Sequence, residues 1–290
     1  MRRSSRSVRR TGRRTRGRTD RVIIRVERAD DARLDPFRWR ERQLANTAQR
    51  REKVGAGMFV AEGDLVVERA LTARCTPVAL LCDDRHAGPL AERLAADVPV
   101  YVGDEALRKD VTGLGVPLSA TGLFVRPALV SPADLLSRSR NVVVMEAVDN
   151  PTNLGAVVRS AAALGWDGLL LDSTSADPLA RRALRVSMGL GLRLPFARTG
   201  ACDDLAGLLE SHGFTTWAMT PDESARDIAT ARPEGERNAL LLGSERSGLS
   251  RSVLEASTHR VRIPMHGGTD SLNVGAAAAI ALQMLGPNGR

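Results

Sequence analysis

Short apolar runs separated by helix-like segments fill the second half of the chain. Five runs have the length and composition of strands that are buried on both faces of a parallel sheet: residues 142–148, 168–172, 214–219, 239–242 and 260–264. Helical patterns lie between them at 154–164, 179–188 and 203–211, and an Ala-rich, almost wholly apolar segment follows at 274–285. The alternation predicts an α/β fold with a parallel sheet, and the last segment predicts a deeply buried helix.

The first half shows a similar but weaker alternation. Strand-like runs occupy residues 58–62, 78–82 and 98–102, and helix-like segments occupy 33–50, 64–73 and 89–96. About a hundred residues of this pattern predict a small α/β domain. We place the domain boundary near Ser131-Pro132, which divides the chain into a tail (1–28), a small domain (29–130) and a larger domain (131–290).

Positive charge is concentrated at the N-terminus. Residues 1–28 contain twelve Arg, Asp20 and Glu27, and therefore carry a net charge of +10. The whole chain carries +8, which leaves −2 for residues 29–290. Because residues 1–18 contain almost nothing apolar to bury, we expect a disordered tail. Three interpretations stay open: an electrostatic RNA-binding arm, an organellar transit peptide, or a true translation start at Val22.

Several classes of protein are disfavoured by the composition. No run of about eighteen apolar residues is present to span a membrane. Cys75, Cys82 and Cys202 lack CxxC spacing, and no secretory signal is recognisable, so we expect reduced thiols in a cytoplasmic protein. The four histidines show no metal-ligand spacing, so no metal site is expected.

Three polar motifs follow strand-like runs of the second half. The first is Asn153-Leu-Gly-Ala with Arg159, the second is residues 242–249 (Leu-Gly-Ser-Glu-Arg-Ser-Gly-Leu), and the third joins residues 263–265 to 271–274. Ligands of open α/β sheets bind beyond the carboxyl ends of the strands, where these motifs are expected to lie. Each motif alone also fits an ordinary helix cap, turn or solvated arginine. The P-loop ending Gly-Lys-Ser and an early GxGxxG are missing.

Taken in this order, the three motifs resemble those of the SpoU (TrmH) family of SPOUT RNA methyltransferases over residues 140–286. The resemblance implies a C-terminal parallel sheet with a trefoil knot, S-adenosyl-L-methionine as methyl donor, and no metal. It also implies a homodimer that methylates the 2′-hydroxyl of ribose in RNA, with ribosomal RNA favoured over transfer RNA. The segment Phe59-Val-Ala-Glu62-Gly63 resembles the small ribosomal-protein-like α/β domain that binds RNA in front of such sheets.

The resemblance also implies roles for particular residues. The catalytic set is Arg159, Asn273, Ser271 and Glu245. The donor-binding set is Leu242, Gly243, Gly248, Ile263, Met265, Leu272 and Asn273. The RNA-binding set is Asn153, Arg159 and Glu62. Because a guanidinium is almost always protonated, we expect Arg159 to orient the hydroxyl and phosphate, plausibly in the pocket of the partner subunit.

Two positions depart from the family pattern, and two other functions remain open. Gly275 stands where Ser commonly follows the Asn-Val of the third motif, and residues 111–127 differ from the usual front domain. One alternative is a non-catalytic RNA-binding or ribosome-assembly protein with the same fold. The other is a nicotinamide- or nucleotide-dependent α/β enzyme, which the missing phosphate loop disfavours.

Overall fold

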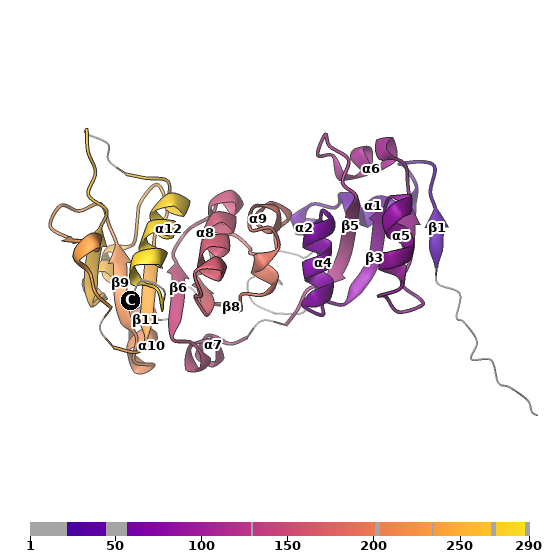
Figure 1. Ribbon diagram of the computed structural model, residues 1–290. Helices are drawn as coiled ribbons and strands as arrows, with labels where there is room; N and C mark the ends of the chain where they lie inside the picture. The colour runs from indigo at the N-terminus through magenta and orange to yellow at the C-terminus, as the bar shows by residue number, and fades with distance from the viewer. Residues whose placement is uncertain are drawn as a thin grey trace, which may run out of the picture.

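The computed structural model describes residues 22–44, 57–128, 130–200, 204–233, 235–267 and 271–287. These residues form two sheets that lie toward opposite ends of an elongated molecule, with helices α8 (Pro151–Ala163) and α9 (Arg181–Val186) between them (Figure 1). The first sheet belongs to the first half of the chain and the second sheet to the second half. The predicted α/β class is confirmed in both halves.

The second sheet is parallel throughout and has seven strands. In spatial order they are β10 (Arg226–Asp227), β12 (His259–Arg262), β9 (Thr215–Met219), β11 (Asn238–Leu242), β6 (Asn141–Met145), β7 (Gly168–Leu171) and β8 (Phe196–Arg198). Every residue of β6, β7 and β11 is buried. Burial on both faces explains why these strands read as continuous apolar runs.

Helices cover both faces of this sheet. Val143, Leu169 and Leu240 pack in one apolar cluster with α8, α9 and α12 (Val274–Leu285). On the other face the sheet packs against α7 (Pro132–Arg138), α10 (Leu205–Ser211) and α11 (Arg251–Ala256). Two glycines let helices approach closely: a Cβ on Gly155 would lie 2.8 Å from the Ala183 carbonyl oxygen of α9. A Cβ on Gly275 would lie 2.9 Å from the Cβ of Ala156, which places α12 directly against α8.

The helix expected at 274–285 is present with those bounds, but the prediction of deep burial is wrong for one side of it, where Ile280 is exposed. The indole Nε1 of Trp166 donates to the carbonyl oxygen of Leu282 at 3.1 Å, which ties the end of α12 to the segment after α8. Gly275 is therefore explained as a packing residue, because any larger side chain there has to displace Ala156 or move α12. Glycine in place of the family's serine also leaves this position of the helix without a hydroxyl.

The first sheet is mixed and has five strands in the order β1 (Ile23–Arg25), β4 (Val100–Val102), β3 (Pro77–Cys82), β5 (Ala120–Val125) and β2 (Met58–Glu62). Helices α4 (Asp64–Thr72) and α5 (Asp84–Ala91) pack on one face. The other face is covered by α6 (Glu105–Thr112) and by the short helices α1 (Asp35–Arg38) and α2 (Glu41–Leu44).

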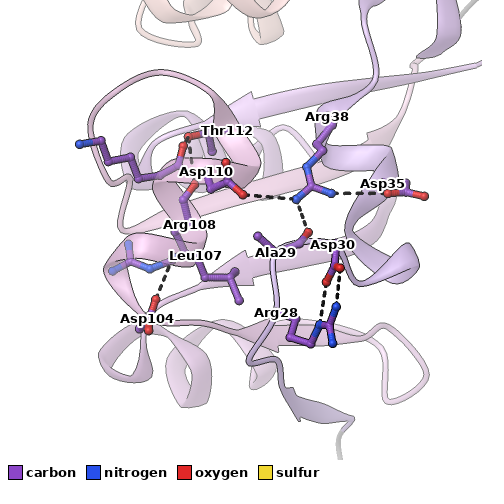
Figure 2. Close-up of polar contacts among 11 residues, drawn as sticks. Arg28, Ala29, Asp30, Asp35, Arg38, Asp104, Leu107, Arg108, Asp110 and Thr112 are labelled. Carbon is purple, nitrogen blue, oxygen red and sulfur yellow. Dashed lines mark hydrogen bonds and ion pairs between the residues drawn. The ribbon is translucent and has the colours of Figure 1, made fainter.

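The tail predicted for residues 1–28 is wrong for its last seven residues. Strand β1 pairs in parallel with β4, and the amide of Val100 donates to the Val22 carbonyl oxygen at 2.9 Å. Val26 is buried. Figure 2 shows that Arg28, two residues later, donates to Asp30, and that Arg38 forms ion pairs with Asp35 and with Asp110 of α6. This edge strand is only three residues long and lies between arginines, so the sequence pattern did not indicate it. Residues 1–21, and the predicted tail there, lie outside the described residues.

Further elements differ from the predicted pattern: α6, α7, α11, β8 and β10 were not predicted, and two other differences lie in the first sheet and its helices. Strand β5 runs antiparallel to both β2 and β3 and completes the sheet within the 111–127 segment. Helix α5 begins at Asp84 instead of residue 89, because the Asp83 side chain accepts from the His86 amide and caps the helix ahead of Pro89. Cys75 and Cys82 are free thiols; burial raises the pKa of both, that of Cys82 to about 12, and Cys202 lies outside the described residues.

Buried ion pairs join the two halves of the chain. The Glu62 side chain at the end of β2 pairs with Arg181, at 2.9 Å, and with Arg185, both from α9. Arg126, just beyond β5, pairs with Asp177. One apolar cluster also contains residues of both sheets. The domain division near Ser131-Pro132 stays a prediction, because these contacts make the two halves depend on each other.

Replacing Glu62 with Gln should destabilise the fold. The side chain is 1% exposed, and its two carboxylate oxygens serve two different half-buried arginines, so the variant removes the carboxylate that both of them pair with. Breaking a buried pair in this way costs roughly 3–5 kcal/mol. Chemical denaturation measures the free energy of unfolding. The control is Glu255→Gln on α11, whose pairing with Arg251 is exposed and should contribute under about 1 kcal/mol.

Candidate active site

A cavity of about 630 Å³ opens at the carboxyl ends of β9 and β11. Its lining combines the second and third sequence motifs with the end of β9, the two residues after it, and one residue each of α11 and α12. The lining residues are Met219, Thr220, Pro221, Leu242, Gly243, Ser244, Glu245, Arg246, Ser247, Gly248, Leu249, Leu254, Ile263, Met265, Ser271, Leu272, Asn273, Val274 and Ala277. All seven residues predicted to bind the donor are in this lining. The volume is typical of a small-molecule site.

The second motif forms a tight turn at the wall of the cavity. The Gly248 amide donates to the Ser244 carbonyl oxygen at 3.0 Å, and the Ser247 amide donates to the Ser244 hydroxyl at 3.1 Å. Gly248 has φ +67°, a conformation that favours glycine. A Cβ on Gly243 would overlap the backbone of Gly248 and Leu249. The lack of a side chain at Gly243 therefore lets the turn close on itself, and its predicted contact with the donor stays a prediction.

Glu146 anchors the far end of this turn, a contact that the sequence analysis missed. Its carboxylate accepts from the Ser250 amide at 2.7 Å, and its own amide donates to the Leu242 carbonyl oxygen at 2.9 Å. Glu146 follows β6, so the strand next to β11 fixes both ends of the second motif. The only sequence feature that could have identified Glu146 is its position as an acidic residue directly after a buried strand.

Asn273 connects all three motifs through one side chain. Its Nδ2 donates to the Asn153 Oδ1 at 3.0 Å and to the Glu245 Oε1 at 2.7 Å. Its Oδ1 accepts from the Gly275 amide at 3.0 Å and so caps α12. The amide therefore uses both donor hydrogens and its acceptor. Asn153 is buried within α8, while Glu245 and Asn273 are exposed at the cavity.

The predicted catalytic residues divide into two groups. Ser271, Glu245 and Asn273 line the cavity. Arg159 does not: it lies on the exposed side of α8, one and a half turns beyond Asn153, and is absent from the cavity lining. Within one chain, then, the first motif reaches the cavity through Asn153 and its hydrogen bond to Asn273, and Arg159 faces solvent.

One predicted assignment changes once the site is assembled, and three residues without an assignment join the site. Glu62 was expected to contact RNA, but it is 3% exposed and paired with Arg181 and Arg185, so its oxygens are not accessible to a substrate. Met219, Thr220 and Pro221 were not predicted as site residues, although they follow β9 at the same edge of the sheet as the second motif. Strand order, which a single sequence does not state, brings them there.

Metal ligands do not gather in the part of the chain that the structure describes: no group of three or more His, Cys, Asp or Glu could hold an ion. Among the same residues, no helix is both long enough and apolar enough to cross a membrane.

Comparison with known proteins assigns the family. The uncharacterized tRNA/rRNA methyltransferase Rv0881 of Mycobacterium tuberculosis is 41% identical over 87% of this chain and 88% of that protein. The 23S rRNA (guanosine(2553)-2′-O)-methyltransferase RlmP of Bacillus subtilis is 27% identical over 81% and 91%. The crystal structure of an AdoMet-bound rRNA methyltransferase from Sinorhizobium meliloti shares the fold with a TM-score of 0.76, at 23% identity over 90% and 96%.

The profile of the SpoU rRNA Methylase family matches residues 140–283, the part of the chain that contains all three motifs and the cavity. This match and the long alignment with the mycobacterial protein confirm both the predicted family and the predicted enzyme class. The chain belongs to the SpoU family of RNA methyltransferases.

Proposed function

We propose that this enzyme transfers a methyl group from S-adenosyl-L-methionine to the 2′-hydroxyl of a ribose in ribosomal RNA. The observation that supports this most is the side chain of Asn273, which joins Asn153 of the first motif to Glu245 of the second at the cavity. A simple helix cap needs only its Oδ1. The additional contacts organise the cavity wall.

The cavity suits a donor that has an apolar body and several polar groups. The apolar part of the wall consists of Leu242, Leu249, Ile263 and Leu272. Backbone groups of the turn at Ser244, and of the segments around Ile263 and Ser271, supply the polar part. Ligand sites commonly combine an apolar lining with a few placed polar groups. The residues present therefore fit S-adenosylmethionine, with Leu242, Gly243, Gly248, Ile263, Met265, Leu272 and Asn273 proposed to hold it. The solved relative from Sinorhizobium meliloti is described as AdoMet-bound.

When bound, the donor supplies a methyl group on a positively charged sulfur. The protein has to hold the ribose hydroxyl in line with that group, and positioning alone can account for much of a rate enhancement. Asn273 and Ser271 are proposed to position the ribose, with Glu245 keeping Asn273 in place. Arg159 is proposed to orient the hydroxyl and an adjacent phosphate, because a guanidinium keeps its proton and offers a planar set of donors.

A homodimer accounts for the position of Arg159. The residue is exposed on α8 and is not part of the cavity of its own chain, so a second copy packed against α8 and α12 can present its own Arg159 to this cavity. Ile280 of α12 is 40% exposed, although the helix is mostly apolar, and is proposed to lie in that interface. We further propose that the loops around Gly243, Ile263 and Leu272 form the trefoil knot, and that the enzyme acts in the cytoplasm.

Ribosomal RNA is the proposed substrate over transfer RNA. The Bacillus subtilis relative, which aligns over most of both chains, is a 23S rRNA 2′-O-methyltransferase by name. The first sheet with its helices is proposed to bind the RNA. The ion pairs of Glu62 and Arg126 would hold that half at a set position relative to the cavity.

Calorimetric titration tests the choice of donor. We expect S-adenosylhomocysteine, the product form of the donor, to bind with one site per chain, and NAD to show no heat of binding. Binding of NAD in place of S-adenosylhomocysteine would overturn the proposal in favour of a nicotinamide enzyme. Binding of neither would favour a non-catalytic RNA-binding protein.

Gly243→Ala should weaken S-adenosylhomocysteine binding at least tenfold, about 1.4 kcal/mol. The new methyl group would overlap the backbone of Gly248 and Leu249, so the turn that forms one cavity wall must shift. The control is Gly88→Ala in α5, where a Cβ meets nothing within 4 Å. Calorimetry measures the affinity and circular dichroism checks the fold. Unchanged affinity in a folded Gly243→Ala protein would separate this turn from donor binding.

A further inference from the structure

Arg246 lies at the tip of the turn that forms one wall of the cavity. It is exposed, and it lines the cavity between Glu245 and Ser247. The adjacent residues have partners: Glu245 accepts from Asn273 at 2.7 Å, and the Ser247 and Ser244 hydroxyls are 2.8 Å apart. Within the described residues, the Arg246 guanidinium has neither a hydrogen bond nor an ion pair. It is also the only arginine of those residues that lines this cavity.

Some arginines near the second sheet have local partners, whereas Arg159 and Arg182 are exposed and have no side-chain partner among the described residues; Arg246 differs from these two by its place in the cavity lining. Arg251 of α11 donates to Glu255 at 2.6 Å, and Arg226 donates to the Thr230 carbonyl oxygen at 2.7 Å. Arg237 donates to the His212 carbonyl oxygen at 3.1 Å. Arg246 has an acidic neighbour in sequence, but Asn273 directs that carboxylate toward the third motif. The turn therefore presents an unpaired cation at the rim of the site.

We propose that Arg246 binds a backbone phosphate of the RNA strand that carries the target ribose. This inference rests on the proposed function, because it assigns the cavity rim to the methyl acceptor. A guanidinium offers paired donors that match the oxygens of a phosphate, and an arginine at the rim can reach a strand that lies across the opening. Arg246 contributes affinity and placement of the strand, whereas Arg159 acts on the hydroxyl itself.

The alternative anion for Arg246 is the carboxylate in the amino-acid part of the methyl donor. The exposure of Arg246 favours RNA, since a group that contacts a small molecule inside a cavity is normally covered by its walls. The two sources differ in their consequences. A phosphate contact weakens RNA binding in a salt-dependent way, while a carboxylate contact weakens S-adenosylhomocysteine binding and leaves 5′-methylthioadenosine, which lacks that carboxylate, unaffected.

Filter binding of an unmodified 23S ribosomal RNA transcript, with S-adenosylhomocysteine present, tests the proposal without any turnover. We expect Arg246→Gln to raise the dissociation constant about tenfold and to reduce the slope of log Kd against log salt by about 0.7–0.9, the contribution of one phosphate. Arg246→Lys should restore most of the affinity, because it keeps the charge. Arg251→Gln is the control, since that arginine is exposed and paired outside the cavity. It should match the wild type.

Steady-state methyl transfer adds a second readout: KM for the transcript should rise about tenfold in Arg246→Gln with kcat within about twofold. An unchanged Kd and salt slope in Arg246→Gln would overturn the proposal. So would a loss of affinity for S-adenosylhomocysteine with unchanged affinity for 5′-methylthioadenosine, which would assign Arg246 to the donor. If the wild type binds the transcript but transfers no methyl group, the proposed function fails while the binding assay still decides the role of Arg246.

Discussion

Arg159→Ala should lower the rate of methyl transfer by about 10²–10⁴-fold, the range found when a group that acts directly on a reacting proton is removed. Affinity for S-adenosylhomocysteine should stay within a few-fold, because Arg159 is not part of the cavity lining. Melting should also change little, since the residue lies on the exposed side of α8. Single-turnover transfer and calorimetry measure the two effects separately.

The control for Arg159 is Arg182→Ala, because Arg182 is equally exposed on the neighbouring helix α9 but faces no site. Near-normal turnover in Arg159→Ala would remove the residue from the mechanism. Mixing Arg159→Ala with Asn273→Ala subunits tests the shared site. If Arg159 completes the partner's cavity, each mixed dimer contains one intact site of two, and because about half of the dimers in an equimolar mixture are mixed, the mixture recovers about a quarter of the wild-type rate. No recovery in verified mixed dimers would place Arg159 at the cavity of its own chain.

Asn273→Asp should lower the transfer rate by about 10²–10³-fold, as expected when a positioned hydrogen-bond donor is lost. The variant keeps the oxygen that caps α12, but it loses the Nδ2 that joins Asn153 to Glu245. It also places a carboxylate where that amide contacted the Glu245 carboxylate at 2.7 Å, and two like charges at that distance repel. Rapid-quench transfer measures the rate, and thermal melting checks that α12 is still capped.

A matched cap variant distinguishes organisation of the site from helix stability. Asn150 caps α8 by accepting from the Thr152 amide and is not part of the cavity lining, so Asn150→Ala should cost about 1 kcal/mol of stability with a near-normal rate. Asn273→Asp should instead lower the transfer rate and leave the stability nearly unchanged. Equal rates in both variants would return Asn273 to the role of an ordinary cap.

The parts of the fold that were predictable from the sequence are those determined by local pattern. Strands β6 and β11 were recognisable because a run such as Val142-Val-Val requires burial on both faces, and α12 because its apolar residues leave no polar face. The cavity was predictable because its motifs follow these strands. The family resemblance supplied the particular residues that chemistry alone left open.

The parts that were not predictable depend on contacts between distant segments. Glu62 reads as a polar residue at a strand end, and only the packing of α9 on β2, 119 residues away in the chain, turns it into a buried counter-ion. The role of Gly243 depends on how closely the backbone of Gly248 returns, which spacing does not reveal. β1 was missed because a short edge strand among arginines has almost no pattern of its own.

Mass spectrometry of nucleosides tests the central claim most directly. The enzyme is incubated with S-adenosylmethionine carrying a deuterated methyl group and with unmodified 23S ribosomal RNA, which is then digested to nucleosides. We predict a single deuterated nucleoside whose label stays with the ribose after the glycosidic bond is broken, and no such product from Arg159→Ala. A label that stays with the base, or no labelled nucleoside from any ribosomal or transfer RNA despite measured donor binding, would contradict the assignment as a 2′-O-ribose methyltransferase.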